Sequence, residues 1–162
     1  MVTSALCLSG CFNPRNTLIF RKLAEQEDQK LTKYTEEALK NSPGLQELDL
    51  ICSNELPLFY GFVLRSKIAG PVRYTSLSYA YDYNSGADYQ KVKGFYLDYF
   101  ARNGWQLVDE YNGGWGPKSV KFRKNRYKVV ISHGAMGDVE YAIDCEKLSD
   151  SGEALPNNLE HL

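Results

Sequence analysis

Histidine is scarce in this sequence, with His133 and His161 the only two among 162 residues. With so few imidazoles, candidates for a general base are few. Cations and anions are nearly balanced at a formal net charge of -1, so the charge gives no reason to expect a nucleic-acid-binding protein. Long apolar runs are missing too, because none reaches the roughly 20 residues that a bilayer-spanning helix needs.

Aromatic residues, by contrast, are abundant, with 12 Tyr, 7 Phe and 2 Trp. Such residues favour strands and packed cores over flexible tails. An apolar fraction of 43% and a charged fraction of 24% are ordinary for a soluble globular protein and exclude disorder over most of the length. The length fits one domain with a substantial core.

The stretch LSGC, residues 8–11, resembles the lipobox of bacterial lipoproteins: an apolar residue, two small residues, then a cysteine that receives lipid and becomes the N-terminus. On this interpretation residues 1–11 are a signal remnant, Cys11 is the lipidation site, and the protein faces the periplasm from a membrane anchor. No Lys or Arg precedes Cys11, although export signals carry a basic n-region, so this interpretation predicts a start upstream of Met1. The alternative is a frayed N-terminus or a short strand with a buried cysteine in a cytoplasmic protein.

The remaining cysteines depend on this choice of compartment. If Cys7 is removed with the signal and Cys11 is lipidated, Cys52 and Cys145 are left to form a disulfide in an oxidising compartment. In a cytosolic protein they would instead be two small buried thiols. The spacing of Cys7 and Cys11 lacks a nearby histidine or second cysteine pair, so we expect no zinc site.

The N-terminal half predicts a helix over residues 17–40, ended by the Asn-Ser-Pro-Gly run at 41–44. Residues 45–52 fit a short helix or a strand equally well. A strand is expected over 59–64, followed by a turn at 68–71.

The second half predicts the core of the domain, over residues 72–148. A long alternating strand at 72–83 precedes an aromatic helix at 87–103, with Ser85 and Asp88 as a capping box. Four further strands are expected, at 105–111, 119–123, 127–133 and 139–148. The single domain spans 16–148, and the polar residues 149–162 are expected to form a flexible tail.

Short connections between consecutive strands predict an antiparallel sheet of five to six strands, covered on one face by the aromatic helix. The class is therefore α+β, and the strand-helix-four-strand order resembles half of a TATA-binding-protein-like fold. The runs FYLDYFARNGW and SVKFRKNRYKVVIS are similar to those of small bacterial envelope proteins of unknown activity, many with a lipobox. The resemblance covers residues 72–148 and brings no catalytic residue with it.

Candidates for chemistry are few in this sequence. Ser132 and His133 are adjacent in a predicted strand, so their side chains point to opposite faces, and we expect His133 to face solvent at the strand end. Carboxylates are scattered near element ends, and the glycine-rich loop at 113–116 lacks the Gly-Lys-Ser/Thr ending of a phosphate loop. We therefore predict no catalytic residue, no cofactor and no metal.

The strongest charge pattern is a basic hairpin at residues 118–128, without any acid. Apolar residues alternate with its cations, so the cations can share the outer face of the sheet and bind phosphate groups on nucleic acid or lipid. The alternative, which we favour, is a solvated strand face that discourages edge-to-edge aggregation. The candidate anion-binding residues are Lys118, Lys121, Arg123, Lys124, Arg126 and Lys128.

Tyr79, Tyr81 and Tyr83 share one strand face, which could stack bases or sugars but is expected to be core under the aromatic helix. Trp115, in the glycine-rich loop, is the aromatic residue expected at the tip of a binding site. Together these features predict a non-enzymatic envelope lipoprotein with a binding or structural role, its protein or small-molecule partner unspecified. The alternative is a cytosolic nucleic-acid- or anion-binding module that uses the basic hairpin.

Overall fold

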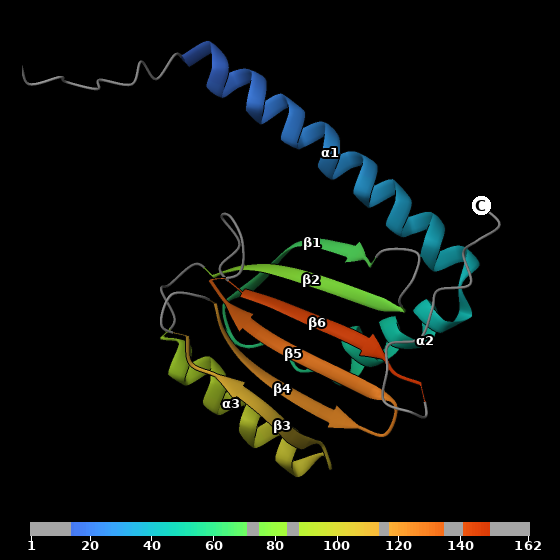
Figure 1. Cartoon of the computed structure of the whole chain (residues 1–162), viewed down its shortest axis with the longest axis vertical. Helices are drawn as coiled ribbons and strands as arrows, with labels where there is room; N and C mark the ends of the chain where they lie inside the picture. Colours follow the sequence, from blue (N-terminus) through green and yellow to red (C-terminus); the bar gives the residue numbers. More distant parts are fainter. Residues whose placement is uncertain (1–13, 71–74, 84–87, 114–116, 135–140, 150–162) are drawn as a thin grey trace, which may run out of the picture.

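Six antiparallel strands in the order β1-β2-β6-β5-β4-β3 form the sheet of the computed structural model, which describes residues 14–70, 75–83, 88–113, 117–134 and 141–149 (Figure 1). The α+β class predicted from the sequence is confirmed. The helical elements are α1 (Pro14–Asn41), α2 (Pro43–Leu50), the π-helical turn η1 (Ile51–Glu55) and α3 (Tyr89–Arg102). The strands are β1 (Phe62–Ala69), β2 (Ser76–Tyr83), β3 (Gln106–Tyr111), β4 (Lys118–Lys124), β5 (Tyr127–His133) and β6 (Tyr141–Lys147).

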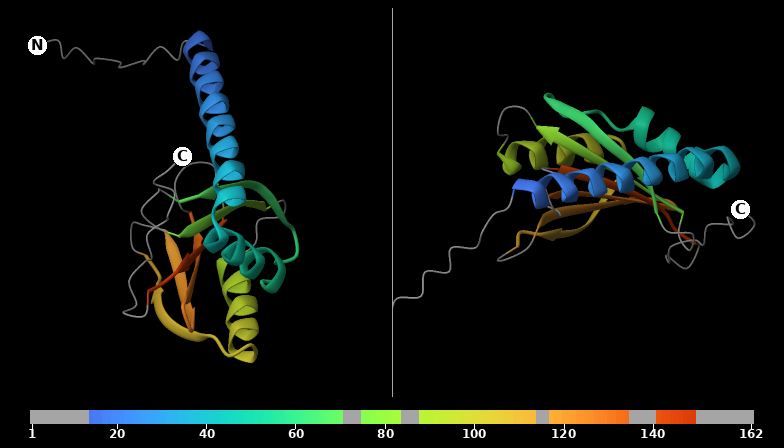
Figure 2. Two further views of the ribbon diagram at one scale, coloured as in Figure 1. Left: turned by 90° about the vertical axis from the view of Figure 1, so that its right-hand side faces the viewer. Right: turned by 90° about the horizontal axis from the view of Figure 1, so that it is seen from above.

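The hydrophobic core lies between one face of the sheet and helices α2 and α3, which occupy the same side (Figure 2). The predicted aromatic stripe of α3 is buried there through Tyr89, Val92, Tyr96 and Phe100. The sequence predicted one covering helix, but α2 and η1 cover this face too. The sheet contributes residues of five strands: Phe62, Ala69, Leu77, Tyr79, Tyr81, Val120, Phe122, Val129, Ile131, Tyr141, Ile143 and Cys145.

The start and the end of helix α3 are each fixed by local hydrogen bonds. Asp88 is its N-cap and accepts a hydrogen bond from the Gln90 amide at 3.1 Å, so the expected start at residue 87 is corrected by two residues. The predicted stop at Asn103 and Gly104 is confirmed: Gly104 has a φ of +74°, and the Trp105 amide returns to the Phe100 carbonyl at 2.9 Å.

The N-terminal helices differ from the expectation. α1 begins at Pro14, three residues early, because proline is well tolerated in a first helical turn. It ends at Asn41, one residue beyond the predicted end, and a new helix starts at once. Ser42 caps α2 by accepting from the Leu45 amide, and Pro43 is its first residue. The ambiguous segment 45–52 is therefore helical.

Strand β1 also differs from the expectation, which was wrong in placing a strand at 59–64 and a turn from residue 68. Ile68 and Ala69 pair with Ser78 and Leu77 of β2 as part of the strand. The polar residues 65–67 interrupt the apolar pattern, so the sequence did not show that the strand continues to Ala69. A register shift between Leu64 and Ser66 also breaks the alternation.

Candidate functional site

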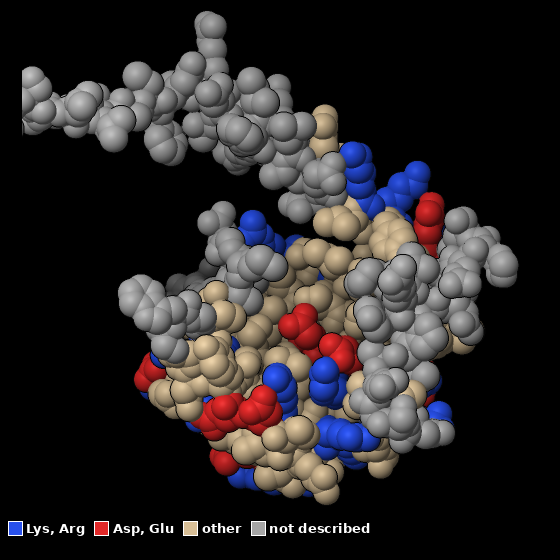
Figure 3. Space-filling model, viewed as in Figure 1, with Lys and Arg blue, Asp and Glu red and all other residues tan. Residues whose placement is uncertain are grey.

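The face of the sheet away from α2 and α3, which we call the open face, is overhung by α1. A cavity of about 510 Å³ lies between them, and Figure 3 shows acidic side chains with basic ones beside them in the middle of this face. Leu31 and Tyr34 form the α1 side of the cavity, and the sheet side combines apolar residues with two serines and two carboxylates. The cavity is lined by Leu31, Tyr34, Ile68, Ala69, Gly70, Ser76, Leu77, Ser78, Val130, Asp144 and Glu146.

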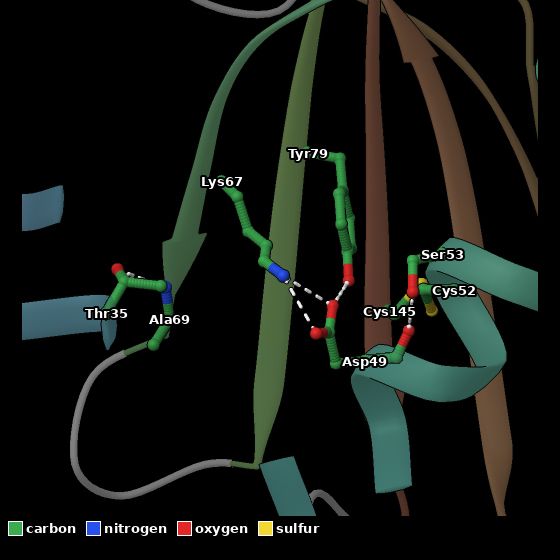
Figure 4. A network of polar contacts seen from close by, with 8 residues as sticks. All are labelled: Thr35, Asp49, Cys52, Ser53, Lys67, Ala69, Tyr79 and Cys145. Atoms are coloured by element: carbon green, nitrogen blue, oxygen red, sulfur yellow. Dashed lines mark hydrogen bonds and ion pairs between the residues drawn. A yellow bond between two sulfur atoms is a disulfide. The ribbon is translucent and has the colours of Figure 1, made fainter. Parts of the chain in front are cut away.

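The position of α1 over the open face is set by contacts near its C-terminus. Thr35 is buried, and its hydroxyl accepts from the Ala69 amide at 3.0 Å while donating to the Leu31 carbonyl at 2.7 Å (Figure 4). Ala38, one turn later, is fully buried. The N-terminal part of α1 extends past the sheet (Figure 2). Among the side chains of α1 that the structure describes, those of the last turns hold the overhang in place.

A polar network fixes α2 to the two strands beside the cavity (Figure 4). The Asp49 carboxylate accepts from the Lys67 ammonium at 2.7 and 2.8 Å and from the Tyr79 hydroxyl at 2.5 Å. Burial, and then the Asp49 carboxylate, hold the pKa of Tyr79 far above its usual range, so its hydroxyl remains a donor. Because Lys67 and Asp49 are partly buried, the network orients α2 more firmly than a surface ion pair would.

Cys52 of η1 and Cys145 of β6 are joined by a disulfide in the structure, with their Cα atoms 6.6 Å apart. The bond lies beside the Asp49 network on the covered face (Figure 4). It connects the helical layer covalently to a central strand, across 93 residues of sequence. The sequence predicted this pair only for an exported protein.

The carboxylates of the open face differ in their partners. Asp82, Asp109 and Glu146 each pair with a cation, namely Arg65 at 3.8 Å, Lys121 at 2.8 Å and Lys128 at 2.6 Å. Asp144 is different, because its cross-strand neighbours are Ser78 and Val130. Burial raises the pKa of its carboxyl, against the opposing effect of a hydrogen bond with Ser78. Asp144 is thus a cavity carboxylate without an ion-pair partner among the described residues.

The Tyr34 hydroxyl on α1 is a second polar group of the cavity wall. Its oxygen is buried and has no hydrogen-bond partner among the residues that the structure describes. Buried polar atoms in proteins are nearly always hydrogen-bonded, but the core hydroxyls of Tyr89 and Tyr96 also lack a partner among the described residues, so this feature of Tyr34 does not by itself mark a ligand contact. Tyr34 lies on the helix stripe expected from the sequence, but nothing in that pattern marks it as a binding residue.

The basic hairpin does not place its six cations on one face. Lys121, Arg123 and Lys128 lie on the open face, whereas Lys118 and Lys124 share the strand face of Val120 and Phe122. Lys118 and Lys124 instead approach the rings of Tyr89, at 5.6 Å, and Trp105, at 6.0 Å. Arg126 lies in the turn, where it also interacts with other groups. The six cations are thus divided between the two faces of the sheet and the turn.

His133 is only partly exposed, instead of facing solvent freely as expected. Its ring contacts those of Tyr89, with centroids 5.7 Å apart, and Tyr141, with centroids 4.7 Å apart. The alternation of β5 puts it on the covered face, while Ser132 is buried on the open face. The two side chains point apart, as expected for strand neighbours.

The structure describes only some of the other candidate residues from the sequence. Tyr79 and Tyr81 are core residues, 3% and 4% exposed, and are not a stacking surface. The lipidation candidate Cys11, the loop residue Trp115 and the tail residue His161 lie outside the described residues. Within the described ranges, no group of three or more His, Cys, Asp or Glu side chains could hold a metal ion. No helix in that same part of the chain is both long and apolar enough to cross a membrane.

Comparison with known proteins gives one similarity. A family model described as START domain-like matches residues 78–137, which is less than half of the 162 residues. The match runs from β2 through α3 and β3 to β5, so it covers most of the sheet and the helix behind it. No curated protein and no solved structure matches the chain. The matched segment lies inside residues 72–148, where the sequence suggested a resemblance to envelope proteins. The comparison supports the START domain-like similarity of residues 78–137 and does not support that resemblance.

Proposed function

We propose that this protein is a non-enzymatic binding protein that holds a small apolar or amphiphilic molecule in the cavity between α1 and the open face. The observation that carries the proposal is the cavity itself. Its volume of about 510 Å³ lies in the range of small-molecule sites, and it combines an apolar wall with a few polar groups. The similarity of residues 78–137 to a START domain-like family supports a ligand-binding role for the same sheet.

An apolar probe tests this proposal. N-phenyl-1-naphthylamine, an uncharged fluorophore that brightens in apolar surroundings, is expected to bind saturably to the purified protein. Val130→Trp places a large ring on the cavity floor and is expected to weaken binding at least about tenfold, or about 1.4 kcal/mol. Fluorescence titration measures both affinities.

Val108→Trp is the matched control, because Val108 is an exposed valine of β3 that does not line the cavity. Its affinity for the probe should stay within about twofold of the parent, a change of about 0.4 kcal/mol. Equal binding by the Val130→Trp variant, with its fold intact by circular dichroism, would place the probe elsewhere and contradict the proposal.

We further propose that the domain acts in the bacterial cell envelope, attached to the membrane through lipid on Cys11. The Cys52–Cys145 disulfide supports an oxidising compartment, because such bonds persist outside the cytosol. Cys11 lies three residues before Pro14, where α1 begins. A helix of 28 residues is about 42 Å long, so α1 would hold the sheet well away from an anchor at its start.

Metabolic labelling of the full native gene product tests the anchor. With a palmitate analogue, the parent protein should take up label in the membrane fraction, and Cys11→Ser should abolish it. Cys7→Ser is the control, because it removes a thiol only four residues away and should leave the labelling intact. Label that persists in the Cys11→Ser variant, or an unlabelled parent protein in the cytosol, would contradict the anchor without affecting the cavity proposal.

A further inference from the structure

The charges of the open face are arranged in rows that cross the strands. In one row Arg123, Lys128 and Glu146 are cross-strand neighbours, and the Lys128 ammonium binds the Glu146 carboxylate at 2.6 Å. In the next row Lys121, Val130, Asp144 and Ser78 are neighbours. Lys121 pairs outward with Asp109 at 2.8 Å, so Val130 separates this cation from Asp144.

This layout leaves one negative charge without an ion-pair partner in the cavity. Asp144 is partly buried, and Ser78 is the group that hydrogen-bonds to it. A carboxylate held away from water is costly unless a cation is nearby. The charge of Lys128 offsets this cost only in part, because Lys128 forms its ion pair with Glu146, whose own charge acts against ionised Asp144. Across the cavity, α1 supplies the side chains of Leu31 and Tyr34.

We propose that the cavity selects amphiphilic cations, with Asp144 binding an ammonium group and the α1 wall covering its apolar body. This inference rests on the proposed binding function and specifies its ligand. Charge complementarity determines the choice, because an ammonium group would form a direct ion pair with the Asp144 carboxylate, which has no ion-pair partner among the described residues. A neutral ligand leaves the carboxylate uncompensated, and an anion is repelled by it.

Three probes with the same twelve-carbon chain test the inference by isothermal titration calorimetry, each at concentrations below micelle formation. We expect dodecylammonium to bind at least about tenfold more tightly than dodecanol, and dodecanoate to bind most weakly. Asp144→Asn should remove the advantage of the amine while leaving dodecanol affinity unchanged. Asp98→Asn makes the same charge change at an exposed position of α3, behind the sheet, and should keep the amine preference.

The outcomes separate this inference from the binding function on which it rests. If dodecanol binds as tightly as dodecylammonium, the cavity binds apolar chains without selecting charge, and only the inference fails. If neither the three chains nor N-phenyl-1-naphthylamine binds, the binding function itself fails. If Asp144→Asn weakens dodecanol as much as dodecylammonium, Asp144 shapes the cavity and does not bind charge, which also overturns the inference.

Thermal melting without ligand gives a second test, because a structural role for Asp144 predicts the opposite change in melting temperature. Because burial raises the pKa of its carboxyl, the ionised form costs stability above that raised pKa, and the cost disappears below the unfolded-state pKa. At neutral pH, Asp144→Asn should therefore melt at the same or a higher temperature. A residue kept for binding at the expense of stability behaves in this way, and a lower melting temperature counts against the inference.

Discussion

Removing the disulfide between Cys52 and Cys145 is expected to lower the free energy of unfolding by about 3–5 kcal/mol. The bond closes a long loop, because the two cysteines are 93 residues apart, and such a cross-link strongly restricts the unfolded chain. Both side chains are buried, 5% and 0% exposed, so their replacement by alanine also loses some packing. Urea unfolding of the oxidised parent and of the Cys52→Ala/Cys145→Ala double variant measures the difference.

The reduced parent protein provides the control for this measurement. Under a strong reductant it should unfold close to the double variant, because both lack the cross-link and differ only in two sulfur atoms. The denaturant dependence of the double variant should be steeper than that of the oxidised parent, since its unfolded chain exposes more surface. An unchanged unfolding midpoint in the double variant would show that the bond does not hold η1 to β6.

The second half of the chain was predictable because each element has a strong period of its own. Tyr-rich alternation indicated β2, and the spacing from Val92 to Phe100 indicated α3. Gly104 indicated the end of α3, where the structure shows a positive φ. The N-terminal half lacks such signals. α2 is only eight residues long, and the polar residues at 65–67 interrupt the pattern of β1.

The cavity could not be predicted from the sequence, because it depends on where α1 lies. Leu31 and Tyr34 fall on a helical stripe that is typical of core packing, and a single sequence does not show which face of the sheet they cover. In the sequence, Asp144 is one of several scattered carboxylates. Only the strand pairing shows that its cross-strand neighbours are uncharged. The basic hairpin, in contrast, was the strongest local signal, and cross-strand and ring contacts divide its cations between two faces.

Phe100→Ala is expected to cost about 3–5 kcal/mol of stability, in the range for a fully buried phenylalanine. The Phe100 ring is completely buried, stacks on Phe122 of β4 with centroids 4.0 Å apart, and meets Trp105 edge-on at 5.0 Å. Its removal leaves a cavity at the contact that holds the last turn of α3 to the sheet. Urea unfolding of the variant measures the loss.

Phe95→Ala is the matched comparison, because it removes the same ring from the same helix at a partly buried position. Phe95→Ala should cost clearly less stability than Phe100→Ala. An equal or larger loss would show that α3 is held mainly through the side on which Phe95 lies.

The two variants also test whether the two faces of the sheet act separately. Phe100 lies on the covered face and does not line the cavity, so under conditions where Phe100→Ala remains folded its affinity for N-phenyl-1-naphthylamine should match that of the parent. A parallel loss of affinity would mean that the sheet transmits core damage to the open face.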